Sequence, residues 1–175
     1  MKKFAVIVLL IAAIVGLVFA FGGNSKATEN GAYLRIHIRA DSNGEADQAV
    51  KYKVRDRVVE YLTPTVAGCE TKEEAMSVLS GKLGEIEAVA DTVLRANGFS
   101  YGAKASLRKE NFPTRVYEEV TLEAGVYDAL ILELGSGTGD NWWCVVYPPL
   151  CFAGGNGNII YKSKIAEIIQ SFFVK

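Results

Sequence analysis

The stretch YLRIHIR, residues Tyr33–Arg39, is the clearest strand signal in the chain and decides the class of fold. One set of its side chains is apolar: Leu34, Ile36 and Ile38. The alternate set is cationic or titratable: Arg35, His37 and Arg39. Because successive side chains on a strand point to opposite faces, this alternation predicts a half-buried strand with a cationic outer face.

Two amphipathic helices are predicted after this strand. Apolar residues recur every four positions over Glu45–Leu62, which is typical of a helix with one face in the core. Pro64 is expected to end this helix, because proline cannot donate a backbone hydrogen bond. Thr71 and Glu74 match a capping box, so a second helix is expected over Lys72–Asn97.

The remainder of the chain is predicted to form mainly strands. Alternating patterns indicate strands over 100–109, 115–122, 126–134 and 142–147, and apolar spacing indicates a last helix over 162–173. The order β-α-α-β-β-β-β-α predicts an α+β fold, with a mainly antiparallel sheet, two long helices packed on one face and a C-terminal helix. We expect residues 33–175 to form this single domain.

The N-terminus has the sequence pattern of an export signal. Lys2 and Lys3 precede the uncharged apolar run Phe4–Phe21, which is typical of a secretory signal peptide and is close to the minimum for a membrane-spanning helix. Residues 1–21 are therefore expected to be either a cleaved signal peptide or a retained membrane anchor, and residues 22–32 a flexible linker. Both alternatives place the domain outside the cytoplasm.

Outside the cytoplasm, two of the three cysteines could form a disulfide. Cys144 and Cys151 would close a small loop over Pro148 and Pro149. The alternative is that both are reduced and buried as small apolar residues. Cys69 has no evident partner. We expect no metal site, because the three cysteines include no C-x-x-C pair and the chain has a single histidine.

No catalytic set can be assembled from the sequence. His37, the one histidine, is better explained as a surface or partner-contacting residue than as a base or metal ligand. Asp41 follows the first strand, but no second carboxylate can be placed beside it. The Gly-rich residues 135–139 lack the Lys and Ser/Thr of a phosphate loop and are expected to be a flexible hairpin loop. The net charge of −1 argues against a nucleic-acid binder, which would show a basic field. No cofactor is expected.

Trp142 and Trp143 are adjacent, so on a strand they should point to opposite faces. One is expected in the core, and the other is either exposed for recognition or packed inside as well. Pro148 and Pro149 should stiffen the loop that follows. The candidate partner-binding residues are Arg35, His37, Arg39, Trp142, Trp143, Pro148 and Pro149.

Five motifs, taken in order, resemble the stage II sporulation protein R family. They are LRIHIRADS (Leu34–Ser42), VKYKVRDRVVEYL (Val50–Leu62), FPTRVY (Phe112–Tyr117), LEAGVYDAL (Leu122–Leu130) and NWWCVVYPPLCF (Asn141–Phe152). The resemblance spans about Tyr33 to Phe152, and the export signal agrees with it.

The resemblance implies a signalling protein of endospore-forming bacteria rather than an enzyme. Such a protein would be exported from the forespore into the space between the forespore and mother-cell membranes. There it would activate a membrane-embedded aspartic protease of the mother cell, which cleaves the sigma-E precursor. The alternatives are an exported cell-wall hydrolase using Asp41 or His37, and a membrane-anchored adaptor domain.

Overall fold

The computed structural model describes residues 29–117 and 120–150. A 3-10 helix, η1 (Glu29–Ala32), precedes the first strand, β1 (Leu34–Arg39). The helices are α2 (Glu45–Val66), α3 (Lys72–Ser80) and α4 (Leu83–Ala96). The later strands are β2 (Ala103–Phe112), β3 (Arg115–Tyr117), β4 (Val120–Leu122), β5 (Gly125–Leu134) and β6 (Asn141–Tyr147).

Two predicted segments cannot be compared with this structure. The signal or anchor over 1–21 and the C-terminal helix over 162–173 lie outside the described residues. Among the helices that the structure does describe, none combines the length and the apolar character that a bilayer crossing requires.

Four strands form a mixed sheet in the order β2-β5-β1-β6. β1 is parallel to β5, whereas β6 pairs with β1 and β2 pairs with β5 in antiparallel fashion. β3 and β4 form a separate antiparallel hairpin. The predicted α+β class is confirmed, and the sheet differs from the prediction in its parallel pair. Three helices connect β1 to β2, and β2 runs in the direction opposite to β1. Because β5 pairs with β2 in antiparallel fashion, it runs parallel to β1.

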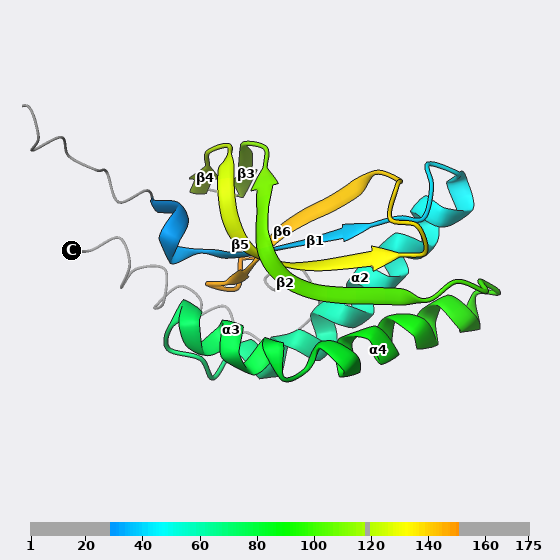
Figure 1. Ribbon diagram of the computed structural model, residues 1–175, viewed down its shortest axis with the longest axis horizontal. Coiled ribbons are helices and arrows are strands. Elements are labelled where there is room, and N and C mark those ends of the chain that lie inside the picture. Colours follow the sequence, from blue (N-terminus) through cyan, green and yellow to red (C-terminus); the bar gives the residue numbers. More distant parts are fainter. Residues whose placement is uncertain (1–28, 118–119, 151–175) are drawn as a thin grey trace, which may run out of the picture.

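The helices lie on one side of the sheet and the β3–β4 hairpin on the other (Figure 1). The main core lies between sheet and helices. Its members are apolar side chains from every layer, including Leu34, Ile36, Ile38, Val54, Leu62, Leu79, Ile86, Leu94, Leu130 and Leu132. The apolar set of the first strand therefore faces the core as expected. The predicted packing of helices on one face is also correct.

The second predicted helix is divided in two. α3 ends at Ser80 and α4 begins at Leu83, with Gly81 and Lys82 between them. Glycine is a poor helix former, and a break at this point lets Leu79 and Ile86 both become fully buried. The predicted cap is confirmed, because the backbone amide of Glu74 donates to Thr71 Oγ1 at 3.1 Å.

The first predicted helix is longer than expected. α2 continues past Pro64 to Val66. Val66 is 1% exposed and belongs to the main core, so its burial stabilises the last turn. Thr63 Oγ1 donates to the carbonyl of Val59 at 2.7 Å, adding a contact in the same turn. Tertiary packing therefore outweighs the missing donor of the proline.

The Gly-rich segment 135–139 is not a hairpin loop. It joins β5 to β6, and β1 lies between these strands, so the loop crosses the end of β1. Gly135 has φ +57°, and a Cβ there would overlap the Asp41 carboxylate. A Cβ at Gly139 would overlap the carbonyl group of Ser42. The glycines are needed because two loops pass each other closely.

Candidate functional site

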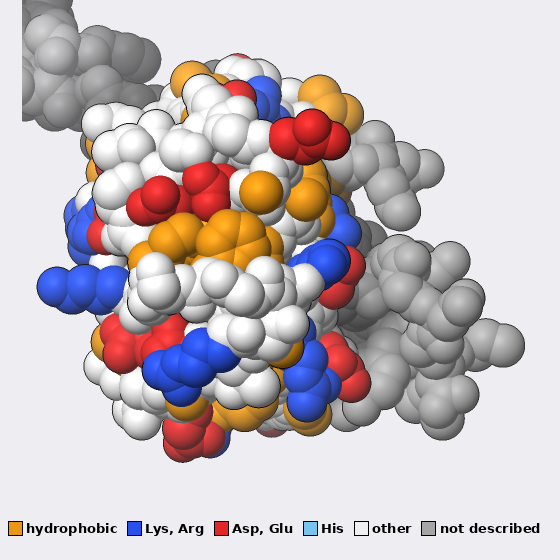
Figure 2. Space-filling view, turned by 90° about the vertical axis from the view of Figure 1, so that its right-hand side faces the viewer, with side chains coloured by type: hydrophobic (Ala, Val, Ile, Leu, Met, Phe, Trp, Pro, Cys, Tyr) orange, Lys and Arg blue, Asp and Glu red, His pale blue; other side chains and the backbone are white. Residues whose placement is uncertain are grey.

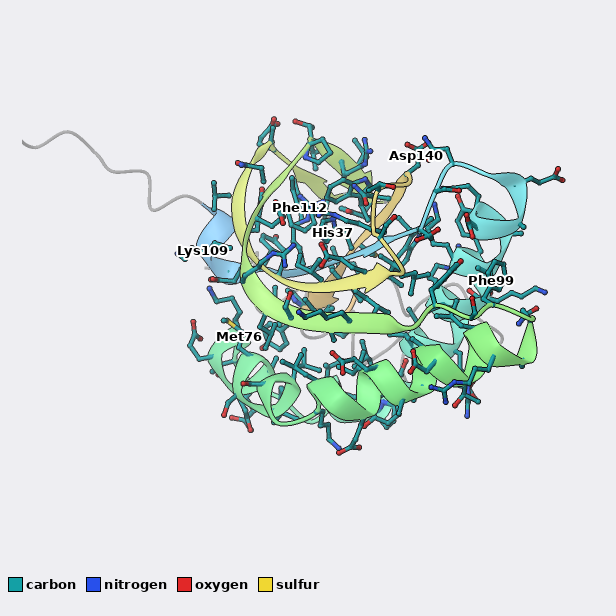
Figure 3. The ribbon with its side chains drawn as sticks, turned by 45° about the vertical axis from the view of Figure 1, so that its right-hand side comes forward. His37, Met76, Phe99, Lys109, Phe112 and Asp140 are labelled. Carbon is teal, nitrogen blue, oxygen red and sulfur yellow. The ribbon has the colours of Figure 1, made fainter. Side chains whose placement is uncertain are left out.

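The sheet face opposite the helices is covered by a second, smaller core. Its buried members are Tyr33, Phe112, Leu122, Tyr127, Ala129, Ile131 and Val145. This cover overturns one prediction, because Arg35 and His37 are both 0% exposed rather than on a solvent-facing surface. In Figure 3, His37 and Phe112 lie together on this side of the sheet, away from Met76 of α3.

Arg35 is enclosed by aromatic rings from distant parts of the chain. Its guanidinium carbon lies 4.2 Å from the ring centroid of Phe112, 4.8 Å from that of Tyr127 and 5.8 Å from that of Tyr117. Nη2 donates a hydrogen bond to the Tyr117 hydroxyl at 2.8 Å. Within the described part of the chain, Nε and Nη1 have no hydrogen-bond partner. Cation–π contact with the rings thus replaces the carboxylate that usually accompanies a buried arginine.

His37 stacks on Trp143, with ring centroids 4.7 Å apart, and lies 5.4 Å from Phe112. Burial, and after it the charges of Arg39, Arg108 and Arg35, lowers the pKa of His37 to about 3. The ring is therefore neutral near pH 7. Neither ring nitrogen has a hydrogen-bond partner among residues 29–117 and 120–150. A buried, neutral imidazole of this kind is a packing residue and has no access to an external substrate.

Arg39 is the one member of the predicted cationic set that remains partly exposed, at 26% of its side chain. It bonds to Glu133 at 3.0 Å and to Glu110 at 3.3 Å. Arg108 bonds to the same two carboxylates, at 3.1 and 3.3 Å. Two arginines and two glutamates therefore balance their charges at this end of the sheet face.

Trp142 and Trp143 point to opposite faces, as predicted. Trp143 contacts the second core, whereas Trp142 packs against the main core from its edge. Trp142, which is half-buried, also forms a partly exposed stripe with two residues of α2. The Arg55 guanidinium carbon lies 5.0 Å from the Tyr52 ring centroid and 5.7 Å from that of Trp142. We call Tyr52, Arg55 and Trp142 the Arg55 stripe; Tyr52 is 46% exposed.

The residues at the end of β6 are buried or cross-linked and do not form an exposed binding loop. Pro148 and Pro149, predicted to lie on a presented loop, are both buried. Cys144 is disulfide-bonded, and Cys69 is a free, buried thiol. Cys151 lies outside the described residues, so its pairing with Cys144 stays a prediction.

Asp41 holds loops together rather than forming a catalytic site. Its Oδ1 accepts a hydrogen bond from the backbone amide of Ser136 at 2.5 Å. Nearby, Asn43 Oδ1 accepts from the amide of Asp140 at 2.6 Å, and the buried Lys51 donates to the Asp140 carbonyl at 3.0 Å. Within residues 29–117 and 120–150, no three His, Cys, Asp or Glu side chains are grouped to hold a metal ion.

Charges of both signs share this end of the molecule. Figure 2 shows acidic and basic side chains interspersed around hydrophobic ones on the face drawn there. A face of mixed sign lacks the basic field that a phosphate backbone requires.

Some site residues were absent from the sequence prediction. Phe112, Tyr117 and Tyr127, which enclose Arg35, lie more than seventy positions away in the chain, as the Arg35–Tyr117 separation of 82 illustrates. Tyr52 and Arg55 lie on α2 outside its buried apolar positions, and neither was among the predicted candidates. A tyrosine three positions before an arginine was the available signal, because residues at this spacing are neighbours on a helix.

Comparisons with known proteins identify relatives of the whole described domain. The family model for stage II sporulation protein R matches residues 30–156. The stage II sporulation protein R of Bacillus subtilis (strain 168) is 36% identical over 135 residues. That alignment covers 77% of this chain and 60% of the relative, so the chain spans about three fifths of the relative's length. No solved structure gives a significant match.

Proposed function

The chain belongs to the stage II sporulation protein R family, and we propose that it is an exported signal that activates a membrane-embedded aspartic protease of the mother cell. The activated protease would then cleave the sigma-E precursor. The signal would act in the space between the forespore and mother-cell membranes. The family match carries this proposal, because residues 30–156 include every described strand and α-helix.

The chemistry of the domain supports a binding role. Its one histidine is buried with a pKa of about 3, and Asp41 is bonded to Ser136 in a loop contact. Neither has the surroundings that the rival hydrolase would need from a general acid or base. A protein that only binds activates its partner by binding the active form more tightly than the inactive form. For a membrane protease, that form would be its active conformation or assembly.

The Arg55 stripe is the best candidate for direct contact with the protease. Aromatic rings and arginine dominate binding hot spots, and here two rings hold one guanidinium at the surface. Arg55 bonds to its neighbour Asp56, whose side chain is 67% exposed and easily displaced. The buried Arg35 and His37 would support the sheet from the other side instead of touching the partner.

The proposal is tested by co-expressing this chain with the candidate protease and the sigma-E precursor in a host that lacks all three. Cleavage of the precursor is scored on immunoblots. Arg55→Ala should reduce cleavage by at least about tenfold, since tenfold corresponds to about 1.4 kcal/mol and removing a hot-spot side chain costs about 2 kcal/mol or more of binding free energy. Arg57→Ala is the matched control, because Arg57 lies on the same helix, is 56% exposed and pairs only with Glu60 among the described residues.

Equal cleavage with Arg55→Ala and with the original chain, at equal exported levels, would remove the stripe from the proposal. Loss of cleavage with both arginine variants would point to a general charge effect.

A further inference from the structure

We propose that the outer edge of β2, over Leu107–Asn111, is a docking site where an extended acidic segment of a partner adds to the sheet as a new strand. The identity of the partner, the extracytoplasmic part of the protease, rests on the proposed function. The edge lies at the opposite end of the strand order from β6, so it is distinct from the Arg55 stripe.

The direction of the backbone groups follows from two hydrogen bonds. Among the described strands, β2 pairs only with β5, in a continuous antiparallel register from Ala103 to Phe112. The amides of Ala103 and Ala105 point away from β5, because they donate to Asp91 Oδ1 at 2.7 Å and to Glu87 Oε1 at 2.8 Å. Outward-facing groups recur every second residue in an antiparallel pair. The next outward amides therefore belong to Leu107, Lys109 and Asn111.

The edge has a closed half, around Ala103 and Ala105, and an open half, over Leu107–Asn111. In the closed half, the outward amides donate to the carboxylates of Asp91 and Glu87 on α4. Over residues 107–111 the described part of the chain provides no acceptor for the outward amides. Figure 1 shows why: β2 first runs along α4 and then curves away from it toward the β3–β4 hairpin. A row of unpaired backbone donors and acceptors on an edge strand is the template that an added strand uses.

The charge of this edge favours an acidic occupant. Among the described residues, Lys109 of the open half and Arg115, just after β2, have no carboxylate partner. Asp128, which is opposite Lys109 in the sheet, is already bonded to Lys72 at 2.8 Å. An acidic segment would therefore neutralise cations that the chain leaves unpaired.

A second copy of the chain is the poorer occupant. Pairing two β2 edges would bring the same unneutralised lysines together, and like charges across strands are destabilising. Lysines on an edge are a known means of preventing such self-pairing. They leave the edge open to a partner of opposite charge.

The surroundings of the open half also offer apolar contact. Val126, which is opposite Asn111 in the register, is 53% exposed, and Val116 of β3 is 67% exposed. Figure 3 places Lys109 and Met76 at this same end of the molecule. An added strand could therefore cover isolated apolar side chains as well as bond to the backbone.

A proline substitution tests the backbone contact directly. Asn111→Pro removes an outward amide without removing a bond to β5, because proline is tolerated where the amide of an edge strand faces solvent. Asn111→Ala is the matched control, since it truncates the same side chain and keeps the amide. In the co-expression assay, with the full chain, we expect the proline variant to lose about tenfold in cleavage of the sigma-E precursor while the alanine variant keeps it. Circular dichroism and thermal unfolding check that both variants fold.

A second measurement does not depend on the protease. Hydrogen exchange of the full chain is followed by mass spectrometry with an eight-residue alternating Glu-Val peptide as the probe, and with a Lys-Val peptide as its control. We expect slower exchange over residues 107–111 with the acidic probe alone.

The two measurements separate the two proposals. If the original chain drives cleavage and the Asn111 variants are equal, the docking site is overturned and the proposed function stands. If the original chain drives no cleavage, the proposed function fails and the exchange result alone decides. Unchanged exchange at 107–111, or equal protection by both peptides, then overturns the docking site.

Discussion

Replacing Tyr117 by phenylalanine removes one hydroxyl group and tests how the buried Arg35 is stabilised. Arg35 is 0% exposed, and its guanidinium donates a hydrogen bond to the Tyr117 hydroxyl at 2.8 Å. A hydrogen bond to a charged group contributes about 1.5–3 kcal/mol, and a buried donor left without an acceptor costs a similar amount. The rings around Arg35 stay in place. We therefore expect Tyr117→Phe to lower the free energy of unfolding by about 2 kcal/mol.

Urea titration followed by circular dichroism measures this loss. Tyr52→Phe is the control, because Tyr52 is exposed and its substitution should change stability by less than about 0.5 kcal/mol. In an Arg35→Met background the Tyr117→Phe change should cost little, because the donor has gone. The reasoning is refuted if Tyr117→Phe matches the original chain, or if it costs the same with Arg35 present and absent.

Three further predictions concern pH, loop packing and the disulfide. Because the folded pKa of His37 is about 3, the unfolded chain binds the proton first, so stability should fall as the pH drops from about 6.5 toward 3, and His37→Phe should weaken this dependence in urea titrations. Gly139→Ala should cost on the order of 3 kcal/mol in thermal unfolding, because the new methyl group meets backbone, whereas Gly68→Ala has open space and should be nearly neutral. Peptide mapping without reduction should link Cys144 to Cys151, and reduction should cost about 2 kcal/mol; two free thiols would contradict this.

The first strand shows what its sequence could and could not reveal. Its alternation predicted the strand and the residues that face the main core, because strand periodicity is a local property. It could not reveal that Arg35 and His37 are buried, because the cover comes from Phe112, Tyr127 and Trp143 far along the chain. Whether the second face of a strand is exposed to solvent depends on tertiary packing, and the alternation of apolar and polar residues does not determine it.

Some helix limits could be predicted from the sequence, whereas others, and the strand order, could not. The cap at Thr71 was predictable because its chemistry lies within four residues. The break at Gly81 and the passage of α2 through Pro64 were not, since burial of neighbouring core residues decided both. The parallel pairing of β1 with β5 was also hidden, because it depends on which later strand enters the sheet beside β1. Similarly, Tyr52 and Arg55 became a candidate site only when Trp142 was placed beside them.

The measurement that tests the central claim most directly is cleavage of the sigma-E precursor in a host that carries the candidate protease, with and without this chain. The account predicts that cleavage appears only when the exported chain is present. It also predicts that the cleavage disappears when the active-site aspartate of the protease is replaced. Cleavage that is equally strong without the chain, or absent when the chain is exported and folded, would contradict the claim that it is an activating signal.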